Sequence, residues 1–189
     1  MKILGIDIGT TSISFAVFED RECLASYTVK NNSALPGSDN IRQDADKILD
    51  IIETQLCGIS REHPNIERLG LTGQMHGILY LDKAGGYGLA THFYHKLNGM
   101  VPANASCLCT ISDYAAMKLA GISRPYMHIS NAASLGLYNL KSNSYDFEAI
   151  SRLELNEALL PGIINQAKIL GENNGRGVCV GLGDNQASF

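Results

Sequence analysis

Three short segments of the chain combine the residue types that can hold a phosphorylated ligand and move a proton. Each segment follows a hydrophobic run: GIDIGTT at residues 5–11, GQMHG at residues 73–77 and GLGDNQ at residues 181–186. The ends of strands in α/β sheets are where loops commonly build ligand sites. These segments are therefore the candidates for the chemistry of the protein.

The first segment suits a polyphosphate. A hydrophobic strand delivers Asp7 at its end, where a hydrated Mg²⁺ needs an oxygen ligand. Gly9 allows a tight turn, after which the N–H groups and hydroxyls of Thr10 and Thr11 can face phosphate oxygens. The segment lacks the Gly-Lys-Ser/Thr of a Walker loop and the helix that follows a dinucleotide fingerprint. An ordinary β-hairpin turn is the alternative interpretation.

The other two segments offer polar groups on flexible backbone. In the second, two glycines flank Gln74, Met75 and His76, whose amide and imidazole are suited to hydroxyl groups. A turn with a solvated histidine is its alternative. The third places Asp184 where a strand gives way to a helix, and a helix N-cap is the alternative there.

Composition narrows the class of protein. The 189 residues carry a net charge of −4, with a pI near 5.7 and no run of basic residues, which argues against a nucleic-acid partner. The five cysteines are odd in number and form no CxxC pair, which favours reduced thiols. No leader-like start and no apolar run of membrane-spanning length is present. We expect a cytoplasmic protein of about one domain, without a membrane partner.

The pattern of elements predicts an α/β fold with a mixed sheet. Three strands joined by short turns predict an antiparallel meander, and a helix capped by Asp39 or Asn40 follows a polar loop. Ser151 and Glu154 fit a capping box for a further short helix. The expected strands cover residues 2–8, 12–19, 23–30, 66–72, 78–81 and 177–182, and the expected helices cover residues 41–56, 89–96 and 111–119.

Two other pairs of reactive side chains are expected to have a structural role rather than a catalytic or metal-binding one. His92 and His95 share a helix face, but no cysteine or carboxylate completes a metal set around them. Cys107 and Cys109 alternate along the chain, so their thiols are expected to point apart.

Taken together, the three segments resemble the FGGY family of carbohydrate kinases, which belongs to the actin, sugar-kinase and Hsp70 ATPase superfamily. GIDIGTTSISFAVFED resembles the first phosphate motif of the family, and LGLTGQMHGILYLD resembles the sugar-contacting strand and turn of its xylulokinases. VCVGLGDNQASF resembles the segment that supplies the catalytic aspartate. Elsewhere, GYGLATHFYH and SNAASLGLYNL are closer to sedoheptulokinase-like members.

The resemblance implies a ribonuclease-H-like domain of the actin-like ATPase class and an ATP-dependent kinase acting on a ketose, sedoheptulose first. Asp184 would be the general base for the sugar hydroxyl, and Asp7 would place Mg²⁺ through water. Gly9, Thr10 and Thr11 would approach the phosphates of ATP. The implied sugar pocket consists of Gln74, Met75, His76, Gly77, Asp184 and Asn185.

The chain also departs from the family pattern. It has no tryptophan, and the Trp-x-Asp-x-Arg-like segment of the family is missing, so the chain looks shortened near residues 83–88. It ends at Phe189, without the C-terminal nucleotide-binding domain. We therefore expect residues 1–189 to be a sugar-binding N-terminal domain that is inactive alone and is compatible with a homodimer. The alternatives are a xylulokinase or other FGGY polyol kinase, and a non-catalytic sugar-binding domain of actin-like fold.

Overall fold

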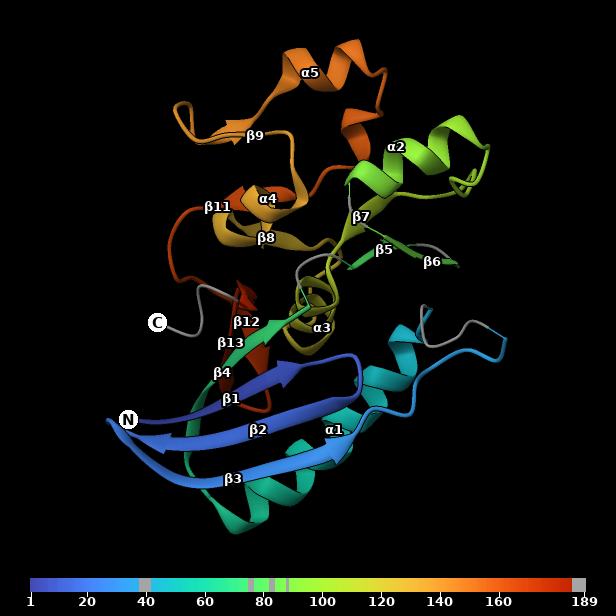
Figure 1. The fold of residues 1–189 in the computed structure, drawn as a ribbon. Helices are drawn as coiled ribbons and strands as arrows, with labels where there is room; N and C mark the ends of the chain where they lie inside the picture. The colour runs from blue at the N-terminus through green and yellow to red at the C-terminus, as the bar shows by residue number, and fades with distance from the viewer. Residues whose placement is uncertain (38–41, 75–76, 82–83, 88, 185–189) are drawn as a thin grey trace.

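The computed structural model describes residues 1–37, 42–74, 77–81, 84–87 and 89–184 (Figure 1). Three of the expected site residues, Met75, His76 and Asn185, lie outside the described residues. The expected helix caps at Asp39 and Asn40 lie outside them as well.

A large mixed sheet forms the lower half of the molecule in Figure 1. Its first three strands make the predicted antiparallel meander, and the central strand β1 pairs in parallel with β4 on its other side. The hairpin β12–β13 and the short strand β14 extend the sheet beyond β4. The strands are β1 (Lys2–Ile8), β2 (Ser12–Glu19), β3 (Glu22–Lys30), β4 (Ile66–Gly73), β12 (Ile169–Asn173), β13 (Arg176–Cys179) and β14 (Leu182–Gly183).

The register of three parallel strands brings their carboxyl ends to one edge of this sheet. Asp7 of β1 lies beside Thr72 of β4, and Thr72 lies beside Leu182 of β14. The Thr72 hydroxyl also donates to the Leu182 carbonyl at 3.2 Å. As a result, the segments that follow β1, β4 and β14 all leave the sheet at the same edge.

One face of the sheet carries the main hydrophobic core. Leu4, Ile6 and Ile8 alternate along β1 toward this core, as expected for a strand that is buried on one side. Two helices pack there, α1 (Ala45–Glu62) and α3 (Ile111–Leu119). Helix α1 buries residues spaced by three or four along its length, namely Ile48, Ile52, Leu56 and Ile59.

Two predicted helix starts were wrong because other aspartates provide the caps. Helix α1 begins after Asp44, whose carboxylate accepts hydrogen bonds from the backbone of Asp46 and Lys47, and it continues to Glu62 rather than ending near residue 56. Helix α5 begins after Asp146, which accepts from Ala149 N at 2.9 Å. Ser151 lies near the end of α5 and starts no helix.

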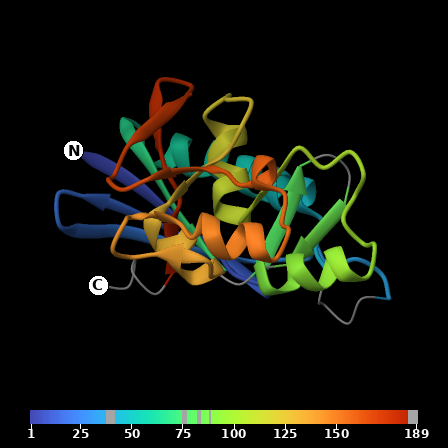
Figure 2. The ribbon, with the colours of Figure 1, turned by 90° about the horizontal axis from the view of Figure 1, so that it is seen from above.

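A second hydrophobic cluster lies above the sheet in Figure 1 and gathers the short elements of the chain. Its centre includes the fully buried Leu108, Met127 and Ile150. Seen from above in Figure 2, α2 and the β5–β6 pair lie far from the N-terminus. The remaining elements are β5 (Gly77–Leu81), β6 (Ala84–Tyr87), α2 (Leu89–Leu97), β7 (Cys107–Cys109), β8 (Tyr126–His128), α4 (Ile129–Leu135), β9 (Tyr138–Asn139), β10 (Ser144–Tyr145), α5 (Phe147–Arg152), the 3₁₀ helix η1 (Glu157–Leu159) and β11 (Gly162–Ile164).

The histidine pair and the cysteine pair are both buried in the structure. His92 is buried and its Nδ1 lies 2.6 Å from the Tyr80 hydroxyl, while burial raises the pKa of Tyr80 to about 12. Cys107 and Cys109 are buried free thiols. Within the described part of the chain, no three His, Cys, Asp or Glu side chains gather as metal ligands, and no helix is long and apolar enough to cross a membrane.

The closing strand predicted at residues 177–182 is interrupted. Val178 lies beside Leu69 of β4, but Leu182 lies beside Thr72, so four steps on one strand match three on the other. The extra residue is accommodated before β14, as in a β-bulge. A side chain at Gly181 would put its Cβ 3.1 Å from Ser112, so glycine permits α3 to approach here.

A buried polar cluster joins α3 and α4 to this interruption. Asp113 closes the N-cap of α3, where its Oδ2 accepts hydrogen bonds from the backbone N–H of Thr110 at 3.0 Å and from its hydroxyl at 2.8 Å. The Asn131 amide lies within 3.3 Å of Asp113 Oδ1 and 3.4 Å of the Gly181 carbonyl. Both Asp113 and Asn131 are fully buried, so hydrogen bonds within the protein hold the cluster.

Asp113 should make stability depend on pH. Burial raises its pKa from 3.8 to about 7, against the opposing effect of its hydrogen bonds. The folded chain therefore keeps a proton that the unfolded chain releases, and the free energy of unfolding should fall as pH rises between these values. Asp113→Asn cannot ionise and should flatten that slope, by up to about 4 kcal/mol across the interval. Urea unfolding from pH 4 to pH 8 measures the effect.

The exposed Asp50 on α1 provides the control, since Asp50→Asn should leave the slope as in the parent chain. A parallel pH dependence in the parent chain and in Asp113→Asn would contradict the assignment to Asp113.

Candidate functional site

Two carboxylates meet at the edge of the sheet where β1, β4 and β14 end. Asp7 lies at the end of β1, and Asp184 follows directly after β14, with β4 between the two strands. Burial raises the pKa of Asp7, and the charge of Asp184 raises it further. The two carboxyl groups therefore share one local electrostatic field, in which it is unfavourable for both to be negatively charged at once. A bound cation would reduce this repulsion.

The turn after β1 is held from inside the molecule. Gly9 N donates to the Ser12 carbonyl at 3.0 Å, and a Cβ at Gly9 would lie only 2.8 Å from that oxygen. The carbonyls of Gly9 and Thr11 accept from the side chain and the backbone of Asn31, at 2.8 and 2.9 Å. Asn31 is itself buried and accepts from the Ser33 hydroxyl at 2.6 Å. With its carbonyls bound inward, the turn presents the exposed side chains of Thr10 and Thr11 to solvent.

Gln43 links the turn to the second segment. Its Nε2 donates to the Thr10 carbonyl at 2.8 Å, and its Oε1 accepts from Gln74 Nε2 at 2.8 Å. Gln74 is also fixed by its backbone, which donates to the Ile8 carbonyl at 3.2 Å. Gln43 therefore holds the ends of β1 and β4 at a fixed separation through two side-chain hydrogen bonds.

The backbone that carries Asp184 is held by α4. Gly183 N donates to the Ser130 hydroxyl at 2.8 Å, and this hydroxyl lies 2.8 Å from His128 Nδ1. Ser130 N also donates to the same ring nitrogen, at 3.3 Å. Burial lowers the pKa of His128, which favours the neutral ring that can accept these bonds.

The structure brings together the described members of the three predicted segments. Asp7, Gly9, Thr10 and Thr11 lie at the same sheet edge as Gln74 and Asp184, and Gly77 begins the neighbouring strand β5. Asp184 is also the first helical residue after β14, so both interpretations of that position are compatible with the described chain.

Sequence reasoning missed the residues that hold the site in place. Asn31, Gln43 and Ser130 lie in a polar loop, ahead of a helix and at the start of a short helix, and each is a common residue type there. No pattern in the sequence distinguishes them, because their contacts are made with segments 22 to 53 residues away.

The residues at this edge fit a Mg²⁺–polyphosphate ligand. Protein-bound Mg²⁺ is usually held by one or two carboxylates together with substrate phosphates, and Asp7 can supply such a carboxylate. Hydroxyls and a glycine turn at residues 9–11 stand beside them. The arrangement can place a phosphoryl group next to a carboxylate able to accept a proton.

Two curated relatives of the chain are named sedoheptulokinase. The chain is 26% identical to the sedoheptulokinase of Mus musculus over 254 residues and to that of Homo sapiens over 256 residues, and both alignments cover 98% of the chain. They cover 53% and 54% of the relatives, so the chain spans about half their length.

Solved structures share the fold. A xylulose kinase from Rhodospirillum rubrum superposes with a TM-score of 0.80 at 16% identity, covering 100% of this chain and 50% of that one. Ligand-bound xylulose kinase from Lactobacillus acidophilus gives 0.78 at 17% identity, covering 99% and 49%. Glycerol kinase from Plasmodium falciparum gives 0.74 at 13% identity, covering 99% and 49%. The predicted actin-like fold is therefore confirmed.

The family comparison matches the part of the chain that contains the first two segments. Residues 2–89 match the N-terminal domain of the FGGY family of carbohydrate kinases, and this stretch includes Asp7, the 9–11 turn and Gln74. Together with the relatives and the shared fold, the match supports the resemblance drawn from the motifs: residues 2–89 are similar to the N-terminal domain of the FGGY family of carbohydrate kinases.

Proposed function

We propose that the chain is the sugar-binding half of an ATP-dependent ketose kinase. The observation that carries the proposal is the shared strand register that places Asp7 and Asp184 on either side of β4, at the same edge as the hydroxyl-bearing turn and Gln74. A protein that only binds sugar needs neither a magnesium ligand nor a base. A second domain that holds the adenosine and closes the cleft is part of the proposal, since such closure excludes water from phosphoryl transfer.

In this mechanism Asp184 is the general base. It accepts the proton of the sugar hydroxyl as that oxygen bonds to the γ-phosphorus of ATP, and the bond between the γ-phosphorus and the bridging oxygen breaks to release ADP. A carboxylate is sufficient because positioning and charge neutralisation dominate this reaction. The bond from Gly183 N to Ser130 would keep the backbone next to Asp184 in place.

Asp7 and the turn after it would bind the phosphates. Asp7 would hold Mg²⁺ through water, and the Mg²⁺ would neutralise charge on the phosphate oxygens. Gly9, Thr10 and Thr11 would approach those oxygens through N–H groups and hydroxyls. The bonds from Asn31 and Gln43 to the carbonyls of the turn support this role, because they keep the turn in one conformation.

The proposed acceptor is a ketose, with sedoheptulose first, on the basis of the named curated relatives. Gln74 and Gly77 would line the sugar pocket with Asp184. Met75, His76 and Asn185 are proposed for the same pocket from the sequence motifs alone.

The first prediction concerns Asp184. In the full-length natural protein, Asp184→Ala should lower kcat by at least about a hundredfold, the usual contribution of a general base, while sugar binding stays measurable. ADP release measures turnover, and calorimetry measures sugar affinity. Asp50→Ala, on the exposed side of α1, should retain full activity. Turnover that survives Asp184→Ala would remove this residue from the role of base.

The second prediction concerns Gln43. Gln43→Ala removes hydrogen bonds to both Thr10 and Gln74, so kcat/KM should fall about tenfold through higher KM values for ATP and the sugar together. Gln55→Ala is the matched control, because Gln55 lies on α1 and, like Gln43, is half-buried. An increase in only one of the two KM values would show that Gln43 does not couple the turn to Gln74.

The third prediction concerns the acceptor. Among sedoheptulose, xylulose, ribulose and glycerol, the full-length protein should give its highest kcat/KM with sedoheptulose in an ADP-release assay. A preference for xylulose would be compatible with the proposed kinase activity but would contradict sedoheptulose as the acceptor.

A further inference from the structure

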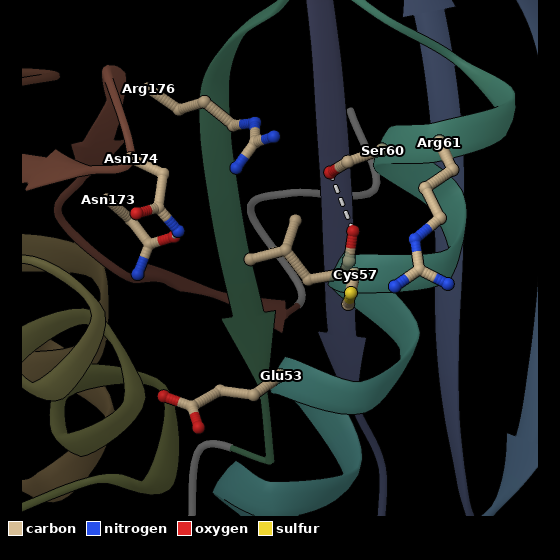
Figure 3. Close-up of a pocket in the computed structure, with 8 residues that line it drawn as sticks. Glu53, Cys57, Ser60, Arg61, Asn173, Asn174 and Arg176 are labelled. Carbon is tan, nitrogen blue, oxygen red and sulfur yellow. Dashed lines mark hydrogen bonds between the residues drawn. The ribbon is translucent and has the colours of Figure 1, made fainter.

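A groove lies at the end of the sheet opposite the candidate site. It runs between the second half of α1 and the β12–β13 hairpin, has a volume of about 580 Å³, and is shown in Figure 3. Gly177, next to the hairpin turn, lies beside Arg68 of β4, four residues before Thr72 at the candidate site. Four residues of strand span about 13 Å, so the groove is separate from the site described above.

The groove has an apolar floor and polar margins. Leu56, which is nearly fully buried, contributes the floor. Figure 3 shows Glu53, Cys57, Ser60 and Arg61 coming from α1, and Asn173, Asn174 and Arg176 coming from the hairpin. A small-molecule site of this size typically combines such a floor with a few polar groups.

The hairpin margin is held in one geometry. Asn174 and Gly175 have φ angles of +49° and +78°, the pattern of an Asn-Gly hairpin turn. The Asn173 amide donates to the Leu119 carbonyl of α3 at 3.3 Å, which attaches the turn to the core. Arg176 therefore extends from a fixed turn rather than from a loose loop.

Both arginines of the groove lack a partner among the described residues. No carboxylate or carbonyl of the described chain pairs with Arg61 or Arg176, although the chain as a whole carries a net charge of −4. Guanidinium groups bind phosphate well because of their planar fork of donors. Glu53 and the two asparagines can accept from, and in part donate to, hydroxyl groups.

We propose that this groove binds a phosphorylated polyhydroxy compound, such as a sugar phosphate. Arg176 binds the phosphate, while Glu53, Asn174 and Ser60 face the hydroxyls. The site is independent of the kinase proposal, because its test needs neither ATP nor turnover.

Cys57 provides the readout. It lines the groove and is exposed, whereas the equally exposed Cys23 lies on β3, away from the groove. Glucose 6-phosphate should slow alkylation of Cys57 by iodoacetamide in the 189-residue chain and leave Cys23 unchanged, as measured by peptide mass spectrometry. Glucose should have no effect, and inorganic phosphate should bind at least about tenfold more weakly than glucose 6-phosphate.

Variants separate specific binding from a general effect of charge. Arg176→Ala should weaken the protection by at least about tenfold, whereas Arg152→Ala on the exposed side of α5 should not. Arg176 and Arg152 both reach solvent, so neither substitution removes a core side chain. The thermal unfolding midpoint of each variant checks that it folds. Unchanged Cys57 reactivity in the parent chain would overturn the proposal. Equal protection by glucose or inorganic phosphate, or an equal loss in Arg152→Ala, would overturn it too.

Discussion

The parallel register of β1, β4 and β14 is the constraint on which the rest of the structure depends. Because Asp7, Thr72 and Leu182 lie in one row, the segments after three strands leave the sheet together, although they are more than 60 residues apart in sequence. A shift of one residue in β14 would turn Asp184 toward the opposite face. The bulge before β14 and the buried Asn131 contact with Gly181 keep that register.

Polar side chains fix the backbone of the segments at this edge of the sheet. Asn31, Gln43 and Ser130 each bind backbone carbonyls or N–H groups of the site segments, so the exposed side chains of the site rest on a layer of hydrogen bonds made by the buried Asn31 and Ser130 and the half-buried Gln43. Such a layer is costly when incomplete, because an unpaired buried polar group loses its solvation. It is well suited to hold the two carboxylates at one edge of the sheet, where burial and then the charge of Asp184 raise the pKa of Asp7.

Sequence reasoning succeeded where the signal was local. The strands of the meander, β4 and helices α2 and α3 were predicted within about two residues, because alternation and helical spacing are properties of neighbouring residues. It failed at the start and end of α1 and at the start of α5, where several polar residues could cap and packing selected Asp44 and Asp146. It also missed the break between β13 and β14, which depends on the approach of Ser112 to Gly181.

By itself the sequence determined the residue types of the site, the hydrophobic strands that precede them and the resemblance to a kinase family, since these are encoded in short contiguous motifs. Only the tertiary structure decided that Asp7 and Asp184 share one field, that Gln43 joins the Thr10 turn to Gln74, and that two arginines border a separate groove. The physical reason is that strand register and side-chain hydrogen bonds between distant segments depend on how the whole sheet packs, and no local pattern records that packing.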